Sequence, residues 1–286
     1  MKRKILAGAI FGAAFIAATA LPTRADEWTK SYPISGRADL HVTTDDGDVI
    51  ITSADQKQID ARVVTQGFKL SPGDVHVEET QSGDQVTLHV RMPHFNWGLW
   101  GAHSKWVHVE LRVPRELDLD VHTGDGNVTT SAVAGHVRID TGDGNVTVSG
   151  LKGEIRLHTG DGHIEASGLD GSLDVNTGDG HVRVDGRFDS LNVRTGDGNI
   201  EAKVLNGSKV ATNWKMHSGD GHINVWLPSD LNAELDAHTG DGQITLDIPV
   251  TVSGSLSHST IHGKLNGGGA ALSISSGDGS IHVQRL

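Results

Sequence analysis

Cysteine is absent from the 286-residue sequence, and aromatic residues make up only 4% of it. Without cysteine the chain has no disulfide framework, no thiolate nucleophile, no cysteine-based zinc or iron–sulfur site and no lipoprotein attachment residue. The composition, with 21% charged and 36% hydrophobic residues, is nevertheless that of a folded chain. Its length allows one or two domains.

Basic residues are also scarce, because 24 lysines and arginines stand against 36 aspartates and glutamates. Sequence-independent binding to nucleic acid depends on clustered cations that neutralise phosphates. No such cluster occurs beyond the amino terminus. We therefore expect an acidic protein that does not bind nucleic acid.

Long apolar runs are limited to one, from Ile5 to Leu21, which follows Lys2, Arg3 and Lys4. A basic start, an apolar stretch and then small residues are typical of a secretory signal peptide. We predict a signal peptide over residues 1–25, with cleavage after Ala25 favoured over Ala20, and no transmembrane segment in the remaining chain. An uncleaved membrane anchor is the alternative, although the run is short for a bilayer span.

Glycine, by contrast, is abundant at 37 residues, and much of it lies in an internal repeat. The motif Thr/Ser-Gly-Asp-Gly, then one variable residue and Val or Ile, occurs eight times. The first five copies are 18 residues apart, and the later gaps are 23, 21 and 37. The longest gap contains a degenerate copy at residues 259–263. The motif aspartates are Asp125, Asp143, Asp161, Asp179, Asp197, Asp220, Asp241 and Asp278.

Within one period, residues alternate between apolar and polar in short runs bounded by glycine, which predicts strands. In the copy around Asp161, the alternation places Leu157, Thr159 and Ile164 inside and His158 and Glu165 outside. Two strands and two turns in 18 residues predict one coil of a parallel β-solenoid, in which equivalent residues of successive coils form columns about 4.8 Å apart. The fold class is therefore all-β, with about nine coils over residues 117–286 and a narrow core that suits few aromatic residues.

The region before the repeats is rich in alternating runs but lacks the strict period. The segment Thr44–Val49 resembles a worn copy of the motif. A solenoid needs its open ends covered, so we predict an N-terminal β-rich cap over residues 26–116, continuous with the solenoid. A separate binding domain is the alternative.

Two interpretations of Gly-Asp-Gly are open. The glycines can supply a positive φ at a turn, while the aspartate accepts a backbone hydrogen bond and the threonines before the motif form a hydroxyl ladder. Alternatively, the column of eight aspartates binds calcium or another cation, since carboxylates stacked at coil spacing repel one another. The second turn of each coil, as in residues 149–153, lacks an aspartate, which favours the structural interpretation. We predict no cofactor, with calcium as the alternative.

Three tryptophans, Trp97, Trp100 and Trp106, lie in or beside a glycine-punctuated segment between two expected strands. Exposed, they would form a site for a protein partner, a glycan or a membrane surface. Packed inward, they would close the end of the solenoid, which is the favoured interpretation.

Catalytic motifs are missing. The sequence has no Gly-x-Ser-x-Gly elbow, no His-Glu-x-x-His and no phosphate-binding loop, and no coil insertion is long enough to wall a cleft. We therefore predict no catalytic residue and no enzyme. A carbohydrate-active enzyme is the remaining alternative.

Taken together, the repeats, the segment Val113–Gly126 that leads into them, and residues 265–269 before the last copy resemble a bacterial family of adhesin-like domains of unknown function. The family consists of exported β-solenoids with Gly-Asp or Ser-Gly turns. The resemblance implies a non-catalytic interaction or structural protein whose partner is a protein or glycan of the cell envelope. It also implies a periplasmic, outer-surface or secreted location, and it supplies no catalytic residues.

Overall fold

The computed structural model describes residues 25–93, 105–252 and 257–286. These residues form 23 strands joined into one sheet and no helix, so the all-β prediction is confirmed. The predicted signal peptide lies, apart from Ala25, outside the described residues. None of the described residues forms a helix that is long and apolar enough to cross a membrane.

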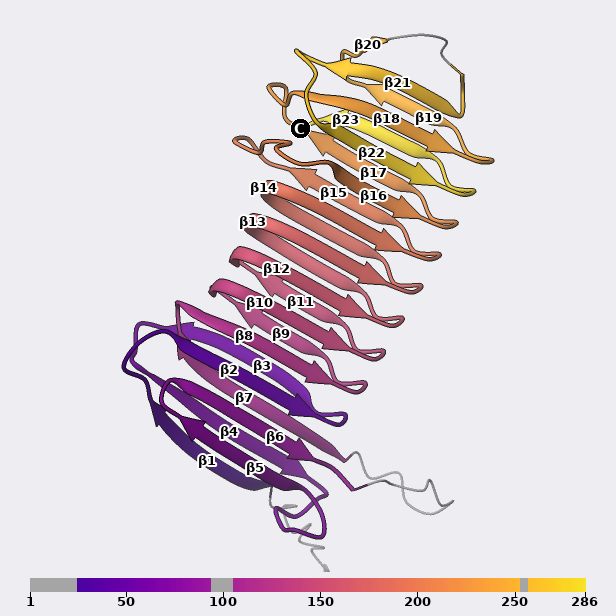
Figure 1. Cartoon of the computed structure of the whole chain (residues 1–286). Coiled ribbons are helices and arrows are strands. Elements are labelled where there is room, and N and C mark those ends of the chain that lie inside the picture. The colour runs from indigo at the N-terminus through magenta and orange to yellow at the C-terminus, as the bar shows by residue number, and fades with distance from the viewer. Residues whose placement is uncertain (1–24, 94–104, 253–256) are drawn as a thin grey trace, which may run out of the picture.

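The centre of the molecule is a stack of two-stranded coils (Figure 1). Over residues 117–204, apart from an irregularity near residues 167–171, each strand segment pairs in parallel with its equivalent 18 residues further along, so that Leu157 lies between Ile139 and Val175. The repeat period thus sets the register of the sheet directly. The strands are β8 Leu117–Thr123, β9 Val128–Ser131, β10 Ala134–Thr141, β11 Val146–Ser149, β12 Lys152–Thr159, β13 Ile164–Thr177, β14 Val182–Thr195 and β15 Ile200–Val204.

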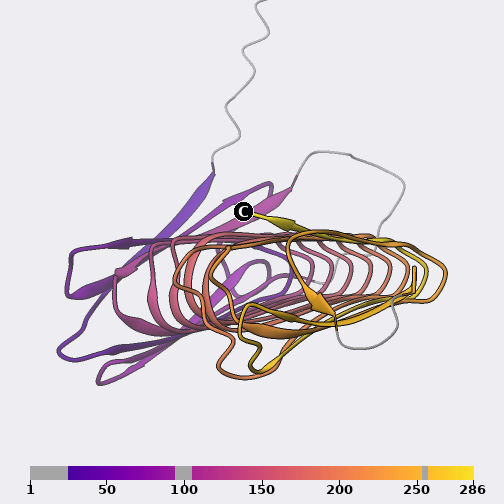
Figure 2. The ribbon, with the colours of Figure 1, turned by 90° about the horizontal axis from the view of Figure 1, so that it is seen from above.

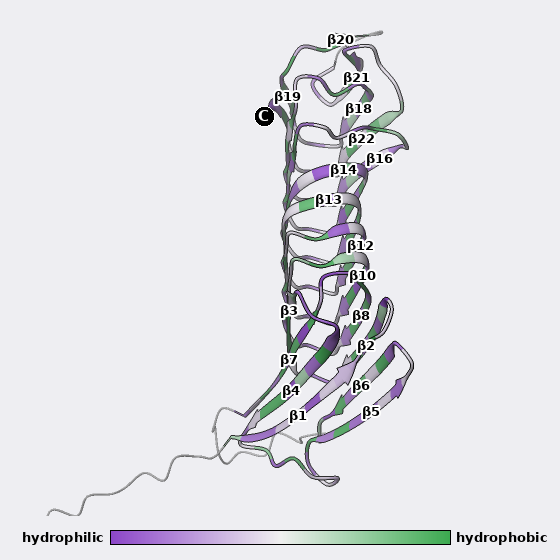
Figure 3. Cartoon of the chain, turned by 90° about the vertical axis from the view of Figure 1, so that its left-hand side faces the viewer, coloured by the Kyte–Doolittle hydropathy of each residue, from purple (hydrophilic) through white to green (hydrophobic). Residues whose placement is uncertain are grey.

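The core is the narrow space inside these coils, which are flattened when viewed along the stack (Figure 2). Leu157, Thr159 and Ile164 are buried, whereas His158 and Glu165 are exposed. The in-and-out alternation predicted for this coil is therefore confirmed. Hydrophobic and hydrophilic residues alternate along the strands in the same way (Figure 3).

The N-terminal end adds coils and antiparallel strands. Strands β2 and β3 pair in parallel with β8 and β9, and the predicted worn copy, Thr44–Val49, spans the turn between them from the end of β2 to the start of β3. On their other side, β6 and β7 continue the parallel pairing, but β1, β4 and β5 are antiparallel to their neighbours. The strands are β1 Asp26–Pro33, β2 Ala38–Thr44, β3 Asp48–Ala54, β4 Gln58–Gln66, β5 His76–Ser82, β6 Gln85–Arg91 and β7 Trp106–Pro114.

The strands before and after the predicted boundary between residues 116 and 117 belong to one sheet, and their buried side chains form one core. The division into a cap over residues 26–116 and a solenoid over residues 117–286 stays a prediction. The sheet as a whole is of mixed orientation, so the parallel arrangement is limited to the coils.

The C-terminal end departs from sequence order. The last coil, β22 and β23, lies between the coil β16–β17 and the coil β18–β19. The degenerate copy at residues 259–263 overlaps the start of β21, which pairs antiparallel with β18. The strands are β16 Trp214–Ser218, β17 Ile223–Leu227, β18 Ala233–Thr239, β19 Ile244–Asp247, β20 Thr251–Val252, β21 Thr260–Leu265, β22 Ala271–Ser276 and β23 Ile281–Arg285.

Two expectations for this end are therefore wrong: the coils do not follow one another in chain order, and the degenerate copy is not a parallel coil. The antiparallel β21 has a physical reason. It covers one side of β18, a strand that would otherwise offer free N–H and C=O groups at the end of the stack.

Candidate interaction surfaces

Two surfaces of the stack carry the polar side chains considered as sites. The first is the Gly-Asp-Gly edge, formed by the eight motif turns. The second, called the polar face, consists of the outward side chains of β2, β8, β10, β12, the second halves of β13 and β14, β16, β22 and β18. Parallel pairing holds equivalent residues of this face in columns, so the polar face is as long as the stack (Figure 1).

The motif glycines are needed for close packing, which corrects the predicted positive φ. None of them has a left-handed φ, while glycines of the second turns such as Gly150, Gly153 and Gly168 do. A Cβ added at Gly162 would overlap the carbonyl group of Gly144 in the preceding coil, with the carbonyl carbon 2.6 Å away. Glycine therefore lets adjacent turns approach each other.

The threonines before the motif are buried but do not bond to one another, so the predicted hydroxyl ladder is wrong in its partners. The Thr159 hydroxyl donates a hydrogen bond to the carbonyl oxygen of Gly144, at 2.9 Å, and accepts one from the Gly162 N–H, at 3.2 Å. Its hydroxyl thus joins two consecutive coils. Thr141, Thr177 and Thr195 bond to the preceding coil in the same way.

The eight motif aspartates form a row on the Gly-Asp-Gly edge and are all exposed. Within the described residues their carboxylates form no side-chain hydrogen bond or ion pair, so the predicted bond to a backbone N–H is not made. No group of three or more histidine, aspartate or glutamate side chains in the described part of the chain is arranged to hold a metal ion. Cation binding stays a prediction that concerns Asp125, Asp143, Asp161, Asp179, Asp197, Asp220, Asp241 and Asp278.

The residue after each motif forms a continuous hydrogen-bond ladder along this edge. Its side chain accepts a hydrogen bond from the backbone N–H of the equivalent residue in the next coil, at distances between 2.8 and 3.3 Å. The ladder runs through Asp48, Asn127, Asn145, His163, His181, Asn199, His222, Ser280 and Gln243. It follows the spatial order of the coils, with Ser280 before Gln243.

The ladder fixes the tautomer of its histidines. His163 accepts the His181 N–H at Nδ1, and His181 accepts the Asn199 N–H at Nδ1. A neutral imidazole that accepts at Nδ1 carries its proton on Nε2. The outward nitrogen is therefore a donor and has no lone pair for a metal ion.

Substitution at His163 tests the ladder. We expect His163→Ala to lower the free energy of unfolding by about 1 kcal/mol, because a backbone N–H loses its acceptor. His163→Asn should restore most of the loss, since asparagine fills this role at Asn127, Asn145 and Asn199. Urea unfolding followed by circular dichroism measures both. Equal stability of the alanine and asparagine variants would show that the acceptor contributes nothing.

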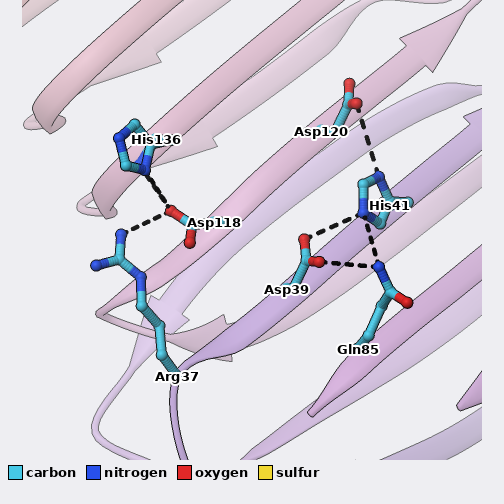
Figure 4. A network of polar contacts seen from close by, with 7 residues as sticks. All are labelled: Arg37, Asp39, His41, Gln85, Asp118, Asp120 and His136. Atoms are coloured by element: carbon cyan, nitrogen blue, oxygen red, sulfur yellow. Dashed lines mark hydrogen bonds and ion pairs between the residues drawn. The ribbon is translucent and has the colours of Figure 1, made fainter. Parts of the chain in front are cut away.

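A polar network lies where the N-terminal coil meets the first regular coils (Figure 4). Asp118 is at its centre, and its Oδ1 atom lies 2.6 Å from the Arg37 guanidinium and 2.8 Å from His136 Nδ1. Partial burial raises the pKa of the Asp118 carboxyl, but the bonds from His136 and Arg37 outweigh it and hold the pKa below its ordinary value. His136 Nε2 also lies 3.6 Å from Glu154, so one imidazole links three coils.

His41 occupies a similar position one column away (Figure 4). Its Nε2 atom lies 3.1 Å from Asp39 Oδ1, and its Nδ1 atom lies 3.6 Å from Asp120 Oδ2. The Gln85 amide lies 2.9 Å from Asp39. These side chains are partly exposed, so each ion pair contributes little stability. What they provide is an ordered array of charges on a flat surface.

Only one of the three predicted partner-binding tryptophans can be placed. Trp106 begins β7, is half-buried and stacks on His108 with ring centroids 4.2 Å apart. Trp97 and Trp100 lie outside the described residues. Whether the segment packs inward stays a prediction.

Sequence reasoning missed the hydrogen-bond ladder and the network around Asp118. The ladder had a signal, because the residue after every motif is Asn, His, Gln or Ser, all of which can accept a hydrogen bond. The network had none, since Arg37 and Asp118 are 81 residues apart and meet only through the order of coils.

The fold and the polar face define a class of all-β proteins in which short coils stack into one long sheet with an exposed polar surface. Residues 37–284 match the Toastrack DUF4097 family model, and the chain belongs to this family, a domain of unknown function. The resemblance to an adhesin-like family of unknown function is thereby confirmed. No curated protein matches the chain.

Several solved structures are similar. A "putative adhesin" from Parabacteroides merdae is 14% identical, with 90% of this chain and 95% of that chain covered and a TM-score of 0.49. A "Putative lipid binding protein" from Parabacteroides distasonis is 17% identical, with coverages of 90% and 96% and a TM-score of 0.49. A "putative adhesin" from Bacteroides fragilis is 9% identical, with coverages of 91% and 97% and a TM-score of 0.45.

Proposed function

We propose that the protein is an exported, non-catalytic interaction protein of the bacterial cell envelope, and that it binds an envelope protein or glycan through the polar face. The observation that carries this proposal is the regular array of charged and polar side chains held in columns by parallel strands. A rigid array loses little side-chain entropy when a partner binds. Export rests on the predicted signal peptide over residues 1–25.

The shape of the polar face supports binding rather than catalysis. Its depressions lie open on the sheet and are lined by residues such as Asp120, Arg138 and Arg156. An enzyme site needs convergent groups in a place from which water can be excluded. Of the described large hydrophobic residues, only Ile50 and Leu286 have more than about a third of their surface exposed, so the surface favours a polar partner.

Binding to native envelope preparations tests the proposal. We expect the double charge reversal Arg138→Glu/Lys215→Glu, on the polar face, to weaken binding about tenfold or more, which corresponds to about 1.4 kcal/mol. The matched control is Arg183→Glu/Lys203→Glu on the opposite face, where Arg183 also pairs with a carboxylate. Equal binding by both variants and the parent would overturn the polar face as the binding surface.

Calcium binding is the second candidate, favoured by the row of unpaired, exposed carboxylates on the Gly-Asp-Gly edge. If the motif is only a turn, Asp161→Asn should leave the melting temperature unchanged or slightly raised, with or without calcium, because one repulsive charge is removed. If the edge binds calcium, millimolar calcium should raise the melting temperature of the parent by linkage, and the substitution should reduce that rise. We expect the first result; a calcium-specific rise absent with magnesium would favour the second.

A further inference from the structure

A hollow interrupts the polar face at its middle, over β12, β13 and β14. It has a volume of about 720 Å³, lies open to solvent and is lined mainly by polar groups. The hollow arises because the side chains of one column on the polar face become shorter from one coil to the next. Glu154 is followed by Ser172 and then Ser190 at equivalent positions.

One wall of the hollow is shaped by a β-bulge. Between β13 and β14 the register shifts, so that Gly171 pairs with Phe188 and Ser172 with Ser190, which leaves Asp189 as the extra residue. A bulge of this kind changes the direction of a side chain and is common beside functional sites. Here it directs a carboxylate to the rim of the hollow.

Arg187 fixes this wall. Its guanidinium donates two hydrogen bonds to Asp189, at 2.6 and 3.0 Å, and a third to Asp170. The hydrogen bonds that Arg187 donates to Asp189 and Asp170 raise the pKa of Arg187, and they lower the pKa of Asp189. The wall is therefore charged and held in place before any ligand arrives.

The opposite wall contains Asp174, Asn192 and Arg156. The Asn192 amide donates to Asp174 at 2.6 Å, and Arg156 donates to Glu154 at 2.6 Å. Asn192 Oδ1 is one of two buried side-chain atoms in the described residues that have no hydrogen-bond partner. Because that atom is buried, a ligand would contact this wall at the exposed Asp174 and Arg156 side chains.

We infer that this hollow binds a neutral saccharide, lying across the coils β12, β13 and β14. A sugar hydroxyl both donates and accepts hydrogen bonds. The hollow offers carboxylate acceptors on both walls and serine hydroxyls on its floor, where Ser172 and Ser190 form no side-chain hydrogen bond within the described residues. Four carboxylates against two guanidinium groups in the lining disfavour an anionic ligand. The open shape suits an extended chain more than a small enclosed molecule.

The inference rests on the proposed envelope function and names the class of partner. It is tested with the full chain, exported and processed by the expressing bacterium and labelled with nitrogen-15. The probes are the neutral hexasaccharides of glucose and N-acetylglucosamine, an oligogalacturonate as the anion and spermine as the cation. We expect a neutral probe to shift the backbone amide signals of Gly153, Gly171 and Ser172.

Two variants inside the hollow and one control outside it test the location of the site. Ser172→Gln/Ser190→Gln fills the floor of the hollow without adding charge and should weaken saccharide binding about tenfold or more. Ser273→Gln, on β22 of the same face but outside the hollow, should leave binding and folding unchanged. Asp189→Ala provides an independent loss of one acceptor and should also weaken binding.

The inference is overturned if no neutral probe shifts these amides, if the anion or spermine binds there instead, or if the filled variant binds the saccharide as well as the parent. Its failure is distinct from failure of the proposed function. If only the saccharide inference fails, the Ser172→Gln/Ser190→Gln variant still binds envelope preparations like the parent. If the proposed function fails, the Arg138→Glu/Lys215→Glu variant also binds them like the parent.

Discussion

Gly162→Ala is expected to separate two neighbouring coils and to lower the free energy of unfolding by about 3 kcal/mol or more. The added methyl group would overlap the carbonyl group of Gly144, which belongs to the backbone and cannot rotate away. Relief requires the two turns to move apart. That movement would break the hydrogen bonds of Thr159 to Gly144 and of Gly160 N–H to the Gly142 carbonyl.

Two other glycines provide matched controls. Gly73 has no atom within 4 Å of an added Cβ and no left-handed φ, so Gly73→Ala should change stability by less than about 0.5 kcal/mol. Gly168 has a φ of 62° but no close neighbour, so Gly168→Ala should cost about 1 kcal/mol through backbone strain alone. Guanidinium unfolding at several protein concentrations measures all three. A Gly162→Ala variant no less stable than Gly168→Ala would show that close packing is not what the motif requires.

The register of the central coils could be predicted because period and geometry agree. Eighteen residues separate Ile139, Leu157 and Val175, and the parallel pairing brings them into one buried column. Alternation then decides which residues are inside. These two properties are local, so they can be read from a single period of the chain.

The order of the coils could not be predicted in the same way. Every copy of the motif specifies the same stacking surface, so the sequence does not say which copy is next to which. The turn at Asp278 lies between those at Asp220 and Asp241, and Gly277 donates to the Gly219 carbonyl while Gly240 donates to the Gly277 carbonyl. Only tertiary pairing distinguishes this order from a sequential one.

The role of the motif glycines also cannot be predicted from the sequence, for a physical reason. Glycine is required either where φ is positive or where another backbone approaches closely, and a sequence does not separate these causes. Here both occur in the same coil, with close approach at Gly162 and positive φ at Gly168. The network around Asp118 also depends on which coils are neighbours, so the sequence does not predict it.

Leu157→Asp is expected to have an effect at least as large, since it places a carboxylate in the narrow core. The Leu157 side chain is 1% exposed and lies between the buried Ile139 and Val175, which offer no hydrogen-bond donor. An unpaired buried charge costs several kcal/mol, and the loss of packing around the removed leucine adds about 2 kcal/mol or more. The coils on both sides share this column, so we expect them to open together.

His158→Asp, at the next position, is the matched control. His158 is exposed on the polar face, and its Nδ1 atom meets only the Asn176 amide, at 3.4 Å. The same aspartate there remains in water, so the free energy of unfolding should change by less than about 0.5 kcal/mol. Thermal unfolding monitored by circular dichroism compares the two variants, and hydrogen exchange locates the opened coils. Similar melting temperatures for Leu157→Asp and His158→Asp would mean that the stack tolerates a charge at its axis, and the assignment of inward and outward columns would then be wrong.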